Sequence, residues 1–275
     1  MPGLVFSRRR LENVDEVRAG HACDYGSNVR KFRNKRVLPL LFVAEICGMK
    51  QISNPSILYF GTPVVLIGTK NVDGSNNLAP ISSIFWLGWR AVIGISAYSQ
   101  STINLLREGE CTLNLPSVRE VGAVNRLALT TGADPVPEAK RLRGYRFEPR
   151  KFEIAGLTPS AGEVVGAPLV RECPVSMEAK LMIADSLAKE NSMMRGRILK
   201  IELKVLRVHL DESIVMEGQP NRVDPDKWRP LIMSFQEFYG LGEKVHASTL
   251  GTIPERLYRT PDIEEAARVA GAVGV

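Results

Sequence analysis

The sequence predicts a mainly β fold, a largely antiparallel barrel decorated by short helices. From residue 57 onward, strand-length segments rich in β-branched and aromatic residues follow one another. The helical segments between them are short, and they do not alternate with strands in the β-α-β order of a parallel sheet. An Asp-Gly turn after the first of these segments is typical of an antiparallel hairpin.

The first strand is expected at 57–69, ILYFGTPVVLIGT. The turn NVDGSNN then leads into NNLAPISSIFWLGW (76–89), which returns along the first strand, and AVIGISAY (91–98) forms the next one. Ser82 and Ser83 interrupt the apolar run of the returning strand, where packing alone would not favour them.

A short helix is expected at 101–110, with Ser101 or Thr102 as its N-cap and Gly109 as its stop. The next segment, CTLNLPS (111–117), is a strand ended by proline.

A second short helix is expected within 119–132. Residues 133–160 carry many Pro, Gly and charged residues, which indicates an excursion over the surface. Long strands follow at 173–185 and 195–210, and the charged residues in the second indicate one solvent-exposed face.

Two domains of unequal character are expected. Residues 1–48 are basic and without pattern, which indicates a poorly ordered leader or a start codon assigned too early, with an outer helix as the alternative. The folded domain is 49–275, and it ends in a helical extension with Thr260 as N-cap and Pro261 in its first turn.

Composition limits the classes of function. At 275 residues, with 44% hydrophobic and 24% charged residues, the chain has the balance of a globular protein, and it holds no apolar run of about 20 residues. Four scattered cysteines and three histidines predict no disulfide framework and no metal site, and favour the cytoplasm. The net charge of +6 is concentrated in the first 48 residues, so we expect neither a nucleic-acid nor a membrane partner.

The motifs of nucleophilic and phosphate-loop enzymes, such as GxSxG, HExxH and GxGxxG, do not occur in the sequence. A cluster of hydroxyls, YSQSTIN (98–104), lies instead between a strand end and a helix start. Ser99, Ser101 and Thr102, together with the N–H groups of the helix opening, predict a seat for a phosphate. A plain helix cap remains the alternative.

The order of several motifs resembles the flavin reductase-like, FMN-binding split-barrel family, which includes flavoredoxins. The resemblance runs from about residue 49 to 242, and its motifs are PVVLIGT, NNLAP, SS, SQSTINLL, GECTLNLP, KFEIAGLTPS, VRECPVSMEAKL and WRPLIMSFQEFYGLGE. It implies a homodimer of six-stranded Greek-key split β-barrels that binds FMN at the dimer interface.

The resemblance also implies the cofactor-binding residues. Asn77 and the backbone of 80–84 would run along the isoalloxazine and ribityl chain, and the hydroxyls of 99–102 would hold the phosphate. Lys151 would reach the phosphate or stand as a solvated surface lysine. The full set is Asn77, Pro80, Ile81, Ser82, Ser83, Ile84, Ser99, Ser101, Thr102, Lys151 and Asn191.

Asn191 departs from the pattern, because many relatives carry a histidine there and an amide cannot carry a proton as imidazole does. Asn104 matches a recurrent asparagine that we expect to be structural. His246 is a candidate neighbour of the site. Phe85 and Trp86 are either walls for the ring or part of the core.

The function implied by the resemblance is an FMN-binding oxidoreductase of the flavin reductase type. It would accept hydride from NADH or NADPH and pass electrons to free flavin or to a redox protein partner. The flavin would carry the hydride chemistry, so no catalytic side chain is expected. The alternative is a flavoredoxin-like electron carrier without its own NAD(P)H activity.

Overall fold

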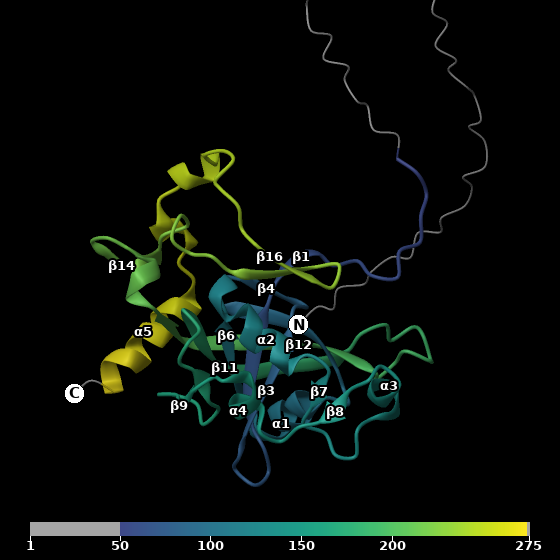
Figure 1. Ribbon diagram of the computed structural model, residues 1–275. Coiled ribbons are helices and arrows are strands. Elements are labelled where there is room, and N and C mark those ends of the chain that lie inside the picture. The colour runs from purple at the N-terminus through teal and green to yellow at the C-terminus, as the bar shows by residue number, and fades with distance from the viewer. Residues whose placement is uncertain (1–49, 274–275) are drawn as a thin grey trace, which may run out of the picture. The chain divides into compact units, whose positions relative to one another are not determined.

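The computed structural model describes residues 50–273, and its largest element is a seven-stranded antiparallel sheet (Figure 1). The predicted leader at 1–48 lies outside the described residues. In spatial order, the strands are β3 (Asn76–Ile81), β2 (Val65–Lys70), β6 (Glu110–Leu115), β11 (Val175–Ser186), β12 (Ile198–Leu210), β5 (Arg90–Ser96) and β4 (Ile84–Leu87).

The predicted hairpin turn joins β2 to β3. Gly74 adopts a positive φ of 79°, and the Asn71 N–H donates to Ser75 O at 2.9 Å, which confirms the Asp-Gly turn. The single strand predicted at 57–69 is wrong, because β1 (Phe60–Pro63) belongs to another sheet. The chain changes sheets where the Val64 N–H donates to Leu231 O at 2.9 Å.

Strands β11 and β12 form the longest hairpin, close to the predicted 173–185 and 195–210. Register shifts interrupt their pairing between Glu178 and Ala179 and between Leu181 and Ile183. Bulges of this kind raise the local twist, which helps the sheet to curl around its core.

The sheet separates two apolar clusters, because successive side chains of a strand point to opposite faces. One face carries the larger cluster, with Ile67, Ile93, Leu113, Ile201 and Leu203 among its fully buried members. The other face packs against helices, and its cluster includes Leu66, Leu78, Leu127, Phe152 and Ala155.

Helix α1 (Gln100–Glu108) follows β5 after a short turn. Its N-cap is Ser99, whose Oγ accepts the Thr102 N–H at 3.1 Å. The predicted caps, Ser101 and Thr102, are wrong, since the strand ends at Ser96 and the helix begins earlier. Gly109 ends the helix in the left-handed conformation, as predicted.

The second predicted helix is confirmed, but the surface excursion predicted at 133–160 is wrong near its end. Lys151, Phe152 and Ala155 are buried where helix α4 packs against α2. The elements of this region are η1 (Val118–Glu120), α2 (Val121–Leu127), β7 (Thr130–Thr131), α3 (Glu138–Arg141), β8 (Arg146–Phe147) and α4 (Lys151–Ala155).

Short ladders complete the fold, and β1 pairs with β15 in a three-stranded sheet of its own. The remaining elements are β9 (Pro159–Ser160), β10 (Leu169–Val170), η2 (Glu212–Ile214), β13 (Val215–Met216), β14 (Gln219–Val223), β15 (Leu231–Ser234), β16 (Glu237–Gly240), η3 (Thr249–Thr252) and η4 (Glu255–Tyr258).

The last helix, α5 (Pro261–Val273), begins at the predicted residue. Thr260 precedes the first helical residue, as predicted for the N-cap, and its carbonyl accepts the Ile263 N–H at 3.0 Å. Its Oγ1 is buried and makes no capping hydrogen bond among the described residues. Three ion pairs among the described residues hold α5 against the sheet: Arg90 with Asp262 at 2.7 Å, and Lys204 with Glu265 at 2.6 Å and with Asp262 at 3.5 Å. None of the helices in the described range is long and apolar enough to cross a membrane.

Candidate functional site

The start of α1 offers unpaired main-chain donors. Ser99 caps the helix through both its side chain and its carbonyl, which accepts the Ile103 N–H at 3.0 Å. The N–H groups of Gln100 and Ser101 find no acceptor in the part of the chain that the structure describes. Two free N–H groups at the positive end of a nine-residue helix are a seat for an anion.

The hydroxyls beside these donors are largely engaged within the protein. Thr102 Oγ1 donates to Ser96 O at 2.8 Å and lies 2.7 Å from Ser99 Oγ. Ser101 Oγ accepts from Asn77 Nδ2 at 3.0 Å, which leaves the hydroxyl proton of Ser101 as a donor. The main-chain groups are therefore the main donors here, with Ser101 beside them.

Asn77 joins the helix start to the first hairpin. Its Nδ2 also donates to Thr69 Oγ1 at 3.0 Å, and the residue is only 2% exposed. Asn104 donates to the same Thr69 oxygen at 3.1 Å and to Asn71 Oδ1 at 2.8 Å. This buried network fixes α1 against β2 and β3, which agrees with the structural role expected for Asn104.

Gly132 brings a second segment to the same place. A Cβ at this position would lie 2.7 Å from Asn77 Oδ1 and 3.2 Å from Gln100 Cγ. The main chain at 130–132 therefore runs directly beside the start of α1. The sequence did not predict residues 130–132 as part of the site. The isolated Gly132 after a predicted helix is the one local feature that could have indicated a close approach of the chain here.

Lys151 is a buried lysine at the start of α4. It is 2% exposed, and its Nζ donates to Thr130 Oγ1 at 2.6 Å. Within the described residues it forms no ion pair, although an ammonium has three protons to donate. Burial, and secondly the charge of Lys140, lowers the pKa of Lys151 to about 8. The alternative of a solvated surface lysine is wrong.

The predicted ring-binding stretch joins β3 to β4. Pro80 and Ile81 end β3, Ser82 and Ser83 form the link, and Ile84 starts β4 with its side chain in the core. Ser83 accepts the Gly94 N–H at 2.8 Å through its carbonyl.

One aromatic side chain contacts Ser83, and two more follow on β4. Ser83 Oγ lies 3.1 Å from Tyr59 OH. Phe85 is 52% exposed, so assigning it to the core is wrong, whereas Trp86 packs against the core.

Strand β5 connects this stretch to the helix start. Gly94, which bonds to Ser83, lies in β5, and the chain passes from the end of β5 into α1. Strand β4 pairs with β5, and β5 leads through a short turn into α1, so β5 links the apolar edge at β4 to the start of α1.

Asn191 and His246 contribute less than the sequence suggested. Asn191 lies in the exposed loop between β11 and β12, and its Oδ1 accepts the N–H groups of Met193 and Met194 at 3.0 and 3.3 Å. The base of this loop reaches the α1 region, because Ala97 N–H donates to Arg197 O at 3.0 Å. His246 is exposed, and its ring bonds only to the neighbouring Ala247 carbonyl among the described residues.

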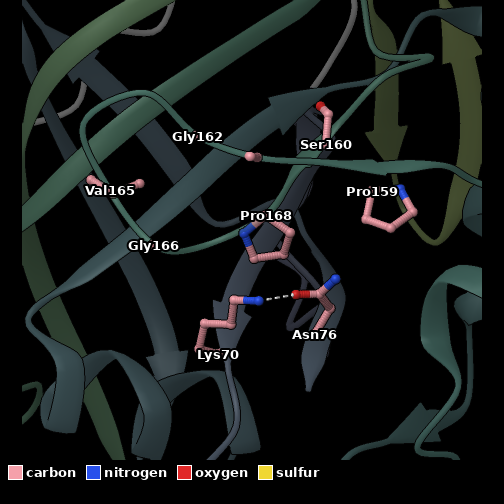
Figure 2. Close-up of a pocket in the computed structure, with 9 residues that line it drawn as sticks. Lys70, Asn76, Pro159, Ser160, Gly162, Val165, Gly166 and Pro168 are labelled. Atoms are coloured by element: carbon pink, nitrogen blue, oxygen red, sulfur yellow. Dashed lines mark hydrogen bonds between the residues drawn. The ribbon is translucent and has the colours of Figure 1, made fainter. Parts of the chain in front are cut away.

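A hollow of about 290 Å³ lies elsewhere, between the β2–β3 hairpin and the segment 159–168 (Figure 2). Lys70 Nζ donates to Asn76 Oδ1 at 2.7 Å on its inner side. A second hollow of about 260 Å³ includes Ser176 and His209. None of the predicted cofactor residues lines either hollow.

Two carboxylates hold the segment 162–166 that walls the first hollow: the buried Glu178 accepts from residues 163–165, and Glu110 Oε1 accepts the Gly166 N–H at 2.6 Å. Glu178 accepts the N–H groups of Glu163, Val164 and Val165 at 3.1, 2.7 and 2.9 Å, and His209 Nε2 lies 2.7 Å from it. The buried Glu178 carboxylate therefore has its hydrogen-bond partners within the protein, which allows it to be buried.

Comparison with known proteins identifies the family. The model of the flavin reductase like domain matches residues 57–242. The chain belongs to this family. A Bacillus subtilis protein named YdfE is 34% identical to the flavin reductase-like chain over 191 residues, which cover 70% of this chain and 89% of YdfE.

Solved structures agree on the fold of this flavin reductase-like chain. Flavoredoxin of Desulfovibrio vulgaris (Miyazaki F) is 22% identical, with a TM-score of 0.58 over 73% of this chain and 97% of its own. Nitrilotriacetate monooxygenase component B from Bacillus cereus is 22% identical, with a TM-score of 0.55 over 70% and 89%. The predicted split-barrel fold is thereby confirmed.

The residues present in this flavin reductase-like chain fit a phosphorylated ligand. The N–H groups of Gln100 and Ser101 supply hydrogen-bond donors. Lys151 supplies a buried positive charge, and its ammonium has protons beyond the one that it donates to Thr130. The exposed Phe85 side chain on β4 offers apolar surface beside β5, the strand that leads to α1.

Proposed function

We propose that the chain binds FMN and acts as a flavin-dependent oxidoreductase that takes electrons from NADH or NADPH. The observation that carries the proposal is the buried Lys151 amine, which has no acidic partner within the described residues and donates to Thr130, in the segment whose Gly132 meets the α1 start. A buried amine without an acidic partner is costly unless an anion accompanies it. Membership in the flavin reductase-like family favours a flavin phosphate as that anion.

Each part of the flavin has residues suited to it. Gln100 N–H, Ser101 and Lys151 would hold the phosphate. The isoalloxazine would lie along the backbone of 80–84, beside the exposed Phe85.

The chain's contribution to the reaction is binding and orientation. Bound FMN would supply the ring that accepts a hydride from a reduced nicotinamide and passes electrons onward. The main-chain groups around Ser82 and Ser83 would orient the polar rim of the ring, and the aromatic edge would exclude water from one face. No side chain is required as an acid or base for hydride delivery.

A homodimer would complete the site. The predicted ring-binding stretch lies among exposed apolar side chains, including Tyr59, Phe60, Phe85 and Leu87. A second copy covering this face would enclose the ring and bury the patch. Cys111 and Cys173 are free thiols, which favours the cytoplasm as the location.

Asn191 favours a second candidate, an electron carrier that accepts electrons from a protein partner. Its carbonyl oxygen is occupied by two backbone N–H groups, and an amide cannot take up a proton. A chain that lacks the histidine of many relatives can bind flavin without reacting with nicotinamides.

The deciding experiment is an absorption spectrum of the desalted protein reconstituted with FMN, followed by anaerobic addition of NADH and then NADPH. A band near about 450 nm that bleaches within seconds supports the reductase. A band that persists with both nicotinamides but bleaches with a reduced protein donor supports the carrier. Failure to retain any flavin would overturn both.

A further inference from the structure

Two lysines meet two consecutive threonines next to the proposed phosphate seat. Lys151 Nζ donates to Thr130 Oγ1 at 2.6 Å, and Lys140 Nζ donates to Thr131 Oγ1 at 3.3 Å. The lysines come from different helices, α4 and α3. Gly132, the next residue, is the one whose close approach to Asn77 and Gln100 brings this segment to the α1 start.

The hydroxyl oxygens of the two threonines are available to accept hydrogen bonds from the lysines. Thr130 Oγ1 donates its own proton to Leu127 O at 2.7 Å, so its lone pairs remain for the Lys151 ammonium. Thr131 Oγ1 accepts both from Lys140 and from the Ala133 N–H at 3.3 Å. Each lysine is therefore positioned by a hydroxyl that uses only one of its three protons.

The positive charges of Lys140 and Lys151 are not neutralised by ion pairs among the described residues. Within the described residues, neither Lys140 nor Lys151 forms an ion pair. Glu148 is the acid that acts on Lys151, but it is already bound by Arg146 at 3.2 Å and by the Arg150 N–H at 2.9 Å. Like charges this close in a partly buried place call for an anion between them.

Lys140 is well placed to complete such a site. It is half-buried, and it lies over the Tyr145 ring, with 5.6 Å between Nζ and the ring centroid. It lies in α3, between β7 and β8 in the chain, whereas Lys151 lies in α4, after β8.

We propose that Lys140 is a second phosphate ligand and sets the ligand class, so that the site selects a flavin ending in a phosphate monoester. This inference rests on the proposed FMN binding. A monoester offers three terminal oxygens and close to two negative charges, enough for two ammoniums and a helix start. Riboflavin has no phosphate, and the two phosphates of FAD form a pyrophosphate bridge in which each carries one negative charge.

The test measures dissociation constants of FMN, riboflavin and FAD by fluorescence titration at neutral pH. It compares the unmutated chain with Lys140→Met, Lys140→Arg and a control, Lys180→Met, at an exposed lysine of β11. We expect Lys140→Met to weaken FMN binding by about tenfold or more, because a charge-assisted hydrogen bond is lost. Riboflavin affinity should stay unchanged, and Lys140→Arg should retain most FMN affinity.

Two outcomes would overturn the inference while leaving FMN binding intact. In one, Lys140→Met binds FMN as the unmutated chain does. In the other, it loses FMN and riboflavin affinity equally, which would make Lys140 a structural residue of the loop. Failure of the proposed function would be visible separately, because the unmutated chain itself would then bind no FMN.

Discussion

At the scale of single residues, Lys151 links flavin binding to pH. Its pKa of about 8 in the folded protein lies below the usual value near 10.4, mainly because it is buried. A bound phosphate favours the charged form, so binding above pH 8 requires uptake of a proton. We therefore expect FMN affinity to fall as pH rises from about 8 to 10, by up to about tenfold per pH unit.

Riboflavin is the control for this prediction, and its affinity should stay nearly flat over the same range. Lys151→Arg should flatten the FMN profile, because arginine keeps its charge. Parallel profiles for FMN and riboflavin would contradict the assignment. For the flavin-free protein the sign is opposite: the unfolded chain binds more protons between pH 8 and 10.5, so this group makes stability rise with pH.

Gly132 gives a steric prediction at the same scale. Gly132→Ala places a methyl group 2.7 Å from Asn77 Oδ1 and 3.2 Å from Gln100 Cγ, so the buried Asn77 side chain, α1 or the threonine pair must shift. We expect a loss of about 1–3 kcal/mol in unfolding free energy, measured by urea denaturation, together with weaker FMN binding. Gly251→Ala is the matched control, since nothing lies within 4 Å of a Cβ there. Equal stability of the two variants would refute the close contact.

At the scale of elements, the Glu178 carboxylate holds residues 163–165 of the segment that walls the first hollow. Glu178→Gln replaces an acceptor of three N–H groups with an amide that has only one accepting oxygen. The expected cost is about 2–4 kcal/mol in unfolding free energy, since buried donors lose their partner. Glu153→Gln, at an exposed glutamate, should leave the urea midpoint unchanged. An unaltered midpoint in both variants would show that the segment does not depend on Glu178.

Local patterns predicted some elements well and others poorly. The Asp-Gly turn, Gly109 and Pro261 act through their own backbone geometry, so their turn, helix stop and helix start could be predicted. Lys151 lies in a polar stretch that looks exposed, and it is buried because α4 packs on a helix more than 20 residues earlier in the chain. Such burial depends on tertiary contacts that no local pattern records.

The same distinction applies to the candidate site. The hydroxyl cluster at 99–102 could be found because a helix start supplies anion-binding groups wherever it occurs. The contribution of Thr130 and Thr131 could not, since it depends on how Gly132 approaches Asn77.

At the scale of the whole molecule, the exposed edge strand β4 is the proposed dimer face. Phe85→Asp should convert the dimer to a monomer in sedimentation experiments and reduce FMN retention, because it places a charge in an apolar contact. Val72→Asp, at an exposed residue of the first hairpin turn, should leave the dimer intact. A Phe85→Asp variant that stays dimeric would place the interface elsewhere.

The attachment of α5 has a consequence for ionic strength. This helix lies beyond the family-matched residues, and Arg90, Lys204, Asp262 and Glu265 supply its partly exposed ion pairs with the sheet. At about 1 M salt the screening length falls to about 3 Å, which weakens such pairs. Amide exchange at 261–273 should therefore accelerate with added salt while the barrel strands stay protected. The C-terminal helix would then dock firmly on the barrel in dilute solution and detach more often as the salt concentration rises.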